Sequence, residues 1–205
     1  MVHIAVEMAP IAKVGGLGDV VTSLARAVQE QGHMVEVIVP SYRFFDSSPL
    51  LKDRKMECRF NWGGTHIVVT SQIVEGLRVF FIHPENGMFE TQRVYADYGD
   101  DVKFDFFCKA ALEFLLQSRR QPDVLHCHDW SSAEVARAYW QDYHNYGLGK
   151  PRVVFTIHNL EFGQQRIATA AFHSQKVTTG ETRRARERRG SVCMCECPRL
   201  PFKHN

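Results

Sequence analysis

The sequence predicts an α/β protein built on a parallel sheet. An apolar run at residues 2–9 leads into a glycine-rich loop. Apolar residues then recur at helical spacing over residues 20–31, until Gly32 ends the pattern. Residues 34–40 have the composition of a second strand. A strand, a helix and a second strand in this order form a right-handed βαβ unit, which requires a parallel sheet.

The alternation of strands and helices continues beyond this unit. Residues 41–65 show no clear period. Two β-rich runs, 66–74 and 78–83, are separated by a turn signal, so they predict a hairpin that flanks the main sheet. Four further elements follow in chain order: a helix over 100–117, a buried strand over 123–127, a helix over 131–143 and a buried strand over 152–157.

Composition and charge bound the class of protein. Of the 205 residues, 44% are apolar and 23% are charged, which is typical of a globular domain. No apolar run approaches the roughly 20 residues of a membrane-spanning helix, so we expect no membrane partner. The formal net charge of +2 gives no reason to expect nucleic acid. The strand-like residues 4–6 follow the first methionine at once, so we expect no signal or transit segment at this end.

Three cysteines lie singly in the body of the chain. Cys58, Cys108 and Cys127 each lie in a segment that contains apolar residues, which suits buried, reduced thiols better than a disulfide framework. We therefore expect a reducing compartment.

The loop between the first strand and the first helix is a candidate phosphate site. Backbone amides at a helix N-terminus bind anions, and Gly15 and Gly16 allow a close approach. Lys13 adds a positive charge suited to a diphosphate, while Asp19 caps amides or accepts sugar hydroxyls. The spacing is neither GxGxxG nor a Walker motif, and a tight turn with a capping Asp19 and a solvated Lys13 remains the structural alternative.

Several segments of the chain resemble one enzyme family. Lys-Val-Gly-Gly-Leu-Gly-Asp at residues 13–19 resembles the Lys-x-Gly-Gly-Leu signature of bacterial glycogen synthases and plant starch synthases. Over residues 3–179 the order and spacing of motifs resemble plant and algal class III starch synthases. The matching segments are Asn-Gly-Met-Phe at 86–89, the helical run at 106–115, His-Cys-His-Asp-Trp-Ser-Ser-Ala at 126–133 and Phe-Thr-Ile-His-Asn-Leu-Glu-Phe-Gly at 155–163.

The resemblance implies a fold and an activity. Such enzymes have two doubly wound, Rossmann-like domains facing a cleft, the GT-B architecture, and this chain matches the N-terminal half. They transfer glucose from ADP-glucose to the non-reducing end of an α-1,4-glucan, retaining configuration, with no metal and no cofactor. The implied partners are ADP-glucose, the glucan and a C-terminal domain needed for turnover. The implied location is a plastid, with a bacterial cytoplasm as the alternative.

Polar groups follow the strand that ends near Cys127. His126, His128 and Asp129 fall at the carboxyl edge of the sheet, where open α/β folds bind ligands. Side chains alternate along a strand, so only His126 and His128 share a face, and we predict no metal site. The structural alternative is that His126 and Asp129 hydrogen-bond to neighbouring loops. By resemblance Asp129 lies beside the donor sugar and is a candidate catalytic residue.

The next strand ends at the same edge with His158 and Asn159. In the similar synthases this pair approaches the glucosyl group, which makes His158 a candidate catalytic residue and Asn159 a candidate substrate contact. A capped strand end is the alternative. Tyr95 matches a position where the family places an aromatic near the donor, and simple packing is its alternative.

The composition changes after Thr179. We therefore assign residues 1–179 to the N-terminal catalytic subdomain and residues 180–205 to a non-homologous tail, predicted to be disordered. This tail carries seven Lys and Arg against three Asp and Glu, a net charge of +4. Cys193, Cys195 and Cys197 do not have the usual spacing of a zinc site. Because of this ending, an inactive remnant that binds glucan, nucleotide sugar or a partner is the alternative function.

A nicotinamide-binding domain is disfavoured. The loop lacks GxGxxG, and the second strand ends in Val39-Pro40-Ser41 without an acid for the ribose.

Overall fold

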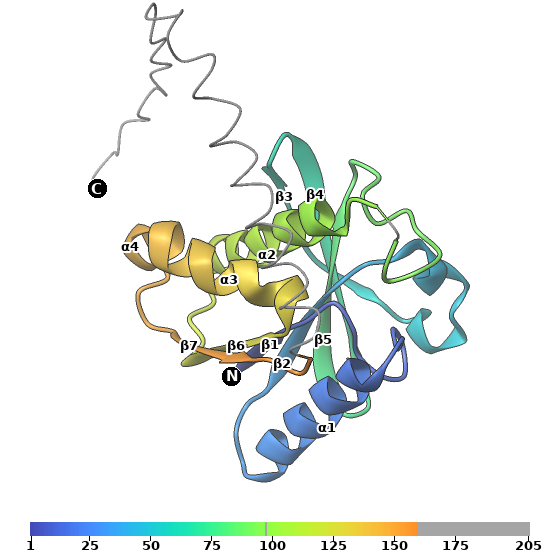
Figure 1. The fold of residues 1–205 in the computed structure, drawn as a ribbon, viewed down its shortest axis with the longest axis horizontal. Coiled ribbons are helices and arrows are strands. Elements are labelled where there is room, and N and C mark those ends of the chain that lie inside the picture. Colours follow the sequence, from blue (N-terminus) through green and yellow to red (C-terminus); the bar gives the residue numbers. More distant parts are fainter. Residues whose placement is uncertain (97, 160–205) are drawn as a thin grey trace, which may run out of the picture. The chain divides into compact units, whose positions relative to one another are not determined.

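Strands and helices alternate in the computed structural model, which describes residues 1–96 and 98–159 (Figure 1). The strands are β1 (Val2–Ile4), β2 (Glu36–Pro40), β3 (Lys55–Trp62), β4 (Thr65–Val74), β5 (Leu77–Pro84), β6 (Val124–His128) and β7 (Arg152–Thr156). The α-helices are α1 (Gly16–Glu30), α2 (Asp100–Gln117), α3 (Ala133–Ala138) and α4 (His144–Tyr146). The 3₁₀ helices are η1 (Arg43–Ser47), η2 (Pro49–Leu51) and η3 (Trp130–Ser132), and η4 (Tyr139–Tyr143) is a π-helix.

Within the described residues, seven strands form one sheet in the order β3-β4-β5-β2-β1-β6-β7. The strands from β5 to β7 are parallel neighbours, so the predicted parallel α/β class is confirmed. The hairpin is formed by β4 and β5, but it does not flank the sheet as predicted. Instead β5 pairs directly with β2 and extends the sheet. The region without a clear period contains β3, an edge strand that the sequence did not predict.

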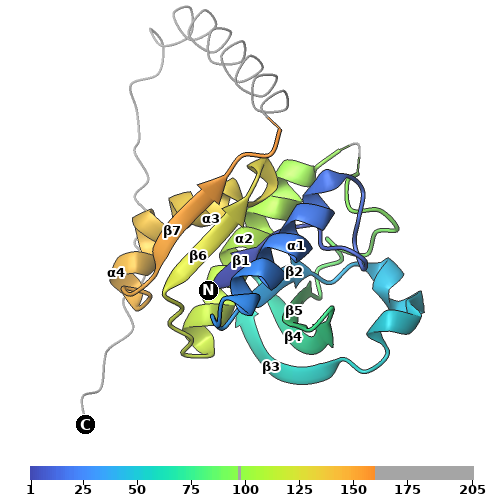
Figure 2. The ribbon, with the colours of Figure 1, turned by 90° about the horizontal axis from the view of Figure 1, so that it is seen from below.

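Helices cover both faces of the sheet, as in a doubly wound fold. Figure 2 shows α1 on one face, while α2 and α3 lie on the other. The strands between them are buried on both sides: Val37, Ile38 and Val39 of β2 are all fully inaccessible to solvent. Each such side chain contributes about 1.5–3 kcal/mol of transfer free energy.

Helix α1 begins at Gly16, four residues before the predicted start. The reason is the close packing of its first turn on the preceding loop. The backbone N–H of Ala9 donates to the carbonyl of Gly18 at 3.1 Å. A Cβ at Gly18 would lie 3.3 Å from both the nitrogen of Ala9 and the carbonyl oxygen of Ala12. Glycine at this position therefore lets the helix N-terminus sit against the loop that carries Lys13.

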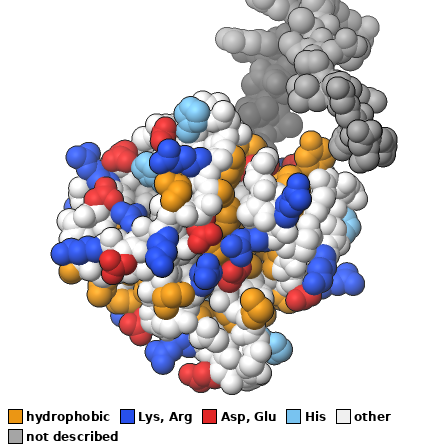
Figure 3. All heavy atoms as spheres, turned by 180° about the vertical axis from the view of Figure 1, so that it is seen from behind, with side chains coloured by type: hydrophobic (Ala, Val, Ile, Leu, Met, Phe, Trp, Pro, Cys, Tyr) orange, Lys and Arg blue, Asp and Glu red, His pale blue; other side chains and the backbone are white. Residues whose placement is uncertain are grey.

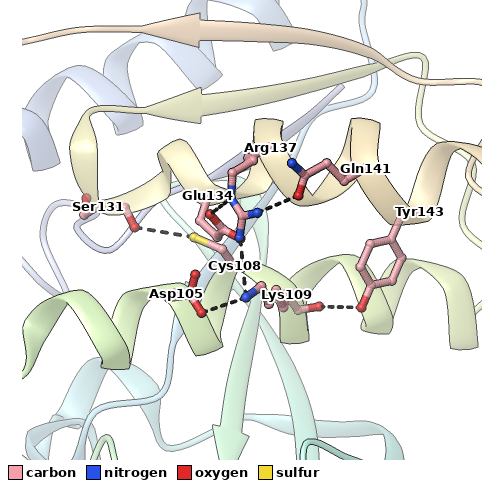
Figure 4. A network of polar contacts seen from close by, with 8 residues as sticks. All are labelled: Asp105, Cys108, Lys109, Ser131, Glu134, Arg137, Gln141 and Tyr143. Carbon is pink, nitrogen blue, oxygen red and sulfur yellow. Dashed lines mark hydrogen bonds and ion pairs between the residues drawn. The ribbon is translucent and has the colours of Figure 1, made fainter. Parts of the chain in front are cut away.

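A polar network joins α2 to α3 (Figure 4). The ammonium of Lys109 lies 2.8 Å from a carboxylate oxygen of Asp105 and 3.4 Å from Glu134. The thiol of Cys108 donates to the carbonyl of Ser131 at 3.5 Å, next to the end of β6. These contacts hold the turn after β6 against α2. The single helix predicted over 131–143 is in fact three consecutive segments, η3, α3 and η4.

The described residues also bear on the cysteines, on membrane-spanning helices and on the surface charge. Cys108 and Cys127 are buried free thiols, as predicted, whereas Cys58 is free as predicted but only partly buried. Among residues 1–96 and 98–159, no helix has the length and apolarity to cross a membrane. Lys and Arg are mixed with Asp and Glu over the face shown in Figure 3. The predicted tail at 180–205, with its three cysteines, lies outside the described residues.

Candidate functional site

Three loops meet at one edge of the sheet. β1 and β6 are parallel, with Ile4 beside Cys127, and β6 and β7 are parallel, with His128 beside Thr156. The segments that follow these strands therefore leave the sheet at its carboxyl edge. They carry the glycine-rich loop, Asp129 and the pair at 158–159. This is the edge at which open α/β sheets bind ligands.

The glycine-rich loop presents an exposed ion pair. The ammonium of Lys13 lies 2.8 Å from a carboxylate oxygen of Asp19, and both side chains are about half exposed. Asp19 lies in the first turn of α1, but among the described residues no side chain caps this helix, so the predicted capping role of Asp19 is wrong. The first-turn amides, which begin at Gly16, thus have no capping side chain from residues 1–96 or 98–159. A helix start of this kind binds anions.

Glu7 organises the loop, and the sequence analysis missed it. Its carboxylate is buried and accepts hydrogen bonds from the backbone amides of Val14 and Gly15, at 2.8 and 3.1 Å. Its other oxygen accepts from the hydroxyl of Tyr95 at 2.6 Å. The prediction that the Gly15 amide faces a ligand is therefore wrong for this structure, because that amide already has an acceptor. A lone acid at the end of an apolar strand was the signal in the sequence.

Removing the Glu7 carboxylate is expected to loosen this loop. In Glu7→Ala, the amides of Val14 and Gly15 and the hydroxyl of Tyr95 lose their acceptor. We expect the free energy of unfolding to fall by about 2–4 kcal/mol, since unsatisfied donors carry a desolvation cost. Urea unfolding measures the loss, and amide hydrogen exchange at Val14 and Gly15 locates it.

Two matched variants separate the contributions. Tyr95→Phe removes one donor and leaves the two amide bonds to Glu7, so we expect a loss of about 1 kcal/mol and unchanged exchange at Val14. Glu7→Gln keeps an acceptor oxygen and should fall between the two. Equal stability of Glu7→Ala and the parent protein would contradict the organising role.

Tyr95 is half-buried beneath the same edge. Its ring lies 5.9 Å from that of Phe104 and 6.2 Å from that of Trp130, measured between centroids. Burial, followed by the hydrogen bond to Glu7, raises the pKa of Tyr95 well above its usual value. The phenol therefore stays protonated and donates to Glu7. Its ring contacts agree with the alternative of simple packing. Its position at this edge also leaves open the prediction of an aromatic residue near the donor.

Asp129 adopts an unusual backbone conformation. Its φ of 62° and ψ of −177° fall in a region that is nearly restricted to glycine and costs about 1–3 kcal/mol. The conformation is held by its N–H, which donates to the carbonyl of Thr156 at 2.8 Å, and by its carboxylate, which accepts from the N–H of Trp130 at 2.9 Å. Such strain concentrates at functional positions, so the geometry is consistent with a site role for Asp129.

A cluster of buried histidines lies beside Asp129. His126 and His128 share one face of β6, as predicted, and His3 of β1 joins them because it pairs with His126. Burial lowers the pKa of His3 to about 3 and that of His128 to about 2, so both rings are neutral. One ring nitrogen from each of the three residues can be chosen so that all three lie within 4.8 Å of one another. His3 of β1 thus adds a third imidazole to the two that β6 supplies.

His158 connects this cluster to the edge. Its Nε2 lies 3.1 Å from Nδ1 of His128, and its side chain is partly exposed. Asn159 follows it and is exposed. His3 was not predicted, because only the order of strands in the sheet brings it beside residues more than 120 positions away. The signal in the sequence was a polar residue inside an apolar strand.

The fold and this edge define a doubly wound α/β domain with a ligand site at the carboxyl ends of its parallel strands. A family model described as the starch synthase catalytic domain matches residues 1–190, and the chain belongs to that family. The catalytic domain of starch synthase IV from Arabidopsis thaliana, solved with ADP and acarbose bound, is similar in structure. It has a TM-score of 0.70 and 42% identity, covering 78% of this chain and 34% of that one. The predicted GT-B fold class is thereby confirmed.

Relatives of known function are starch and glycogen synthases. Soluble starch synthase 3 of Solanum tuberosum is 55% identical over 179 residues, which cover 87% of this chain and 14% of that protein. Starch synthase 3 of Arabidopsis thaliana is 53% identical over 191 residues, covering 93% and 18%. Glycogen synthase 1 of a Synechococcus strain is 41% identical over 179 residues, covering 83% and 36%. The predicted family is confirmed, and the chain spans about a third or less of these relatives.

Proposed function

We propose that this chain is the donor-binding part of a retaining glucosyltransferase that uses ADP-glucose and extends an α-1,4-glucan at its non-reducing end. The proposal is supported by membership of the starch synthase catalytic domain family and by a similar structure solved with ADP. The names of the plant relatives, chloroplastic and amyloplastic, support a plastid location. A bacterial cytoplasm is the alternative location, because a glycogen synthase of a Synechococcus strain is also among the relatives.

The observation that carries the proposal is the exposed loop before α1. It combines a cation, Lys13, with a helix N-terminus that has no capping side chain in the part of the chain that the structure describes. Together they offer positive charge from a side chain and from backbone amides, which is the chemistry that recognises a diphosphate. In transfer, the bond from the glucose C1 to the diphosphate oxygen breaks, and the electron pair leaves with ADP. Groups that bind the diphosphate therefore stabilise the charge that develops in the transition state.

The roles of the other residues follow from their places at the edge. Gly16 supplies a first-turn amide to the diphosphate, while Gly15 keeps the loop folded over Glu7. Asp129, His158 and Asn159 lie after the neighbouring strands and orient the glucose. Tyr95 supports the loop from below through Glu7. The oxygen of an acceptor hydroxyl forms the new bond to the glucose C1, and the hydroxyl proton passes to the departing ADP.

Replacing Lys13 tests the diphosphate contact. In a chimera that joins residues 1–190 to the rest of the starch synthase IV catalytic domain, Lys13→Ala should weaken both ADP and ADP-glucose. A charge-assisted contact contributes about 1.5–3 kcal/mol. Lys13 is half-exposed and must first break its ion pair with Asp19, so we expect a loss at the lower end of this range. Calorimetry should therefore show a roughly tenfold increase in Kd for each ligand.

Asp19→Asn is the matched control. It removes the carboxylate that holds Lys13 and a negative charge beside the phosphates, so ADP should bind about twofold to threefold more tightly. Unchanged affinity for both ligands in Lys13→Ala, with the fold intact, would show that the loop does not bind the diphosphate.

A further inference from the structure

Three imidazole rings form a hydrogen-bonded chain that leads to the candidate site. Nδ1 of His3 lies 2.8 Å from Nε2 of His128, and Nδ1 of His128 lies 3.1 Å from Nε2 of His158. The rings belong to β1, to β6 and to the segment after β7, which are neighbours in the sheet. His3 and His128 are completely inaccessible to solvent, whereas His158 is partly exposed.

The buried end of the chain sets the direction of these bonds. A neutral imidazole has one N–H and one acceptor nitrogen, so each ring in the chain must donate on one side and accept on the other. Nε2 of His3 is buried and has no hydrogen-bond partner among the described residues. Placing a proton there would leave a buried N–H unsatisfied, which proteins rarely tolerate. The proton of His3 therefore lies on Nδ1 and is donated to His128.

The same direction then passes along the chain. Because Nε2 of His128 accepts, its proton lies on Nδ1 and is donated to Nε2 of His158. We propose that His3 and His128 are positioning residues that fix the rotamer and the Nδ1–H tautomer of His158. His158 then offers a hydrogen-bond donor to a sugar oxygen, and its occupied Nε2 is not a base for a substrate proton.

The role of His158 in glucose transfer rests on the proposed function. Its tautomer does not, because it depends only on residues of this protein. Neutral rings are required throughout, and burial of His3 and His128, which lowers the pKa of each, meets that requirement. The three hydrogen-bonded histidines thus make His158 more than a residue at the sheet edge. They fix its Nδ1 as the nitrogen that donates a hydrogen bond.

A divalent cation held by His3, His126 and His128 is the competing arrangement, since their nitrogens lie close together. The observed contacts favour hydrogen bonds. Nε2 of His126 lies 2.7 Å from the hydroxyl of Thr156, and the facing nitrogens of His3 and His128 are only 2.8 Å apart. The rings of His126 and His128 are also stacked, with centroids 4.2 Å apart at 24°, so their nitrogens do not point to one centre.

Nitrogen NMR of the 205-residue chain tests the proposal directly. With ¹⁵N-labelled histidine near neutral pH, long-range proton–nitrogen correlations report which ring nitrogen carries the proton. We expect Nδ1–H for His3, His128 and His158 in the unmodified protein. A proton on Nε2 of His158 would overturn the proposal without recourse to any variant.

Two substitutions separate positioning from general destabilisation. His128→Gln should release His158 into a mixture of both tautomers, whereas His126→Gln, on the same face but outside the chain, should leave His158 as Nδ1–H. If His158 remains Nδ1–H in His128→Gln, the proposal that His128 fixes its tautomer is refuted. Titration with Zn²⁺ completes the test, because a tightly bound equivalent that is lost in His3→Gln would show a metal site instead.

Activity of the chimera distinguishes this inference from the proposed function. His128→Gln should lower kcat about threefold to tenfold with little change in KM, because the donor of His158 is no longer fixed. If His158→Ala leaves kcat and KM unchanged, the proposed role of His158 in glucose transfer fails. The NMR measurement would still test the tautomer of His158 independently of that result.

Discussion

Mild acid is expected to destabilise the fold by about 3 kcal/mol between pH 6.5 and pH 5. His3 and His128 have pKa values lowered to about 3 and about 2 by burial, so in the folded protein both stay neutral throughout this range. In the unfolded chain each returns to the ordinary value of 6.5 and binds a proton as the pH falls. The unfolded state is therefore favoured by about 1.4 kcal/mol per pH unit for each histidine.

The sign follows from the direction of the shifts. Because the folded pKa values are depressed, the stability that these residues permit is complete above pH 6.5 and is lost as the pH falls toward 3. The pKa of His126 is lowered in the same direction by burial and by His158, and it steepens the loss. Urea unfolding at several pH values measures the slope.

A single substitution provides the control for this slope. In His3→Gln one of the two most strongly shifted histidines is gone, so the loss between pH 6.5 and pH 5 should shrink by about 1.5 kcal/mol. A flat stability profile in the parent protein, or an unchanged slope in His3→Gln, would contradict the assignment of buried, neutral rings.

The elements with strong periodicity could be predicted from the sequence. The helix expected over 100–117 has the bounds of α2, and the hairpin and the last two strands are present within one or two residues. These segments bury one face or both, so their apolar patterns are clear. β3 was missed because it is an edge strand with no residue that is fully buried, so its sequence carries little alternation.

The start of α1 shows a different limit. Gly16 and Gly18 are poor helix formers, so the apolar pattern becomes visible only at Val20. What starts the helix earlier is a tertiary contact, the packing of Gly18 on the loop at Ala9 and Ala12. Local propensity cannot report such a contact.

The candidate site was predicted in outline but not in its internal contacts. Parallel strands bring their carboxyl ends together, so the positions of Lys13, Asp129 and His158 at one edge followed from the strand pattern. Glu7 and His3 were missed because their partners are set by the order of strands in space. Both are single polar residues in the buried first strand or at its end, and such residues must find hydrogen bonds in the fold.

The 205-residue chain by itself is expected to transfer glucose at least about ten-thousand-fold more slowly than a complete synthase. The match covers 34% of the starch synthase IV catalytic chain, and we expect the groups that oppose this edge to lie in the unmatched part of such an enzyme. Loss of one preorganised donor to the transition state costs about 2.7–4 kcal/mol, and a cleft with one wall lacks several. Lys13 and the start of α1 should still bind ADP weakly, because these groups are already exposed in place.

The measurement follows labelled glucose from ADP-glucose into glycogen or amylopectin, with the chimera assayed alongside. The chain must first be shown to be folded and monodisperse, since Val154, Phe155 and Ile157 at β7 are 42–53% exposed and favour association. A detectable shift of histidine signals on addition of ADP, with no incorporation above background, is the expected result. Incorporation within about tenfold of the chimera would show that this edge alone lowers the barrier, and the requirement for an opposing wall would be wrong.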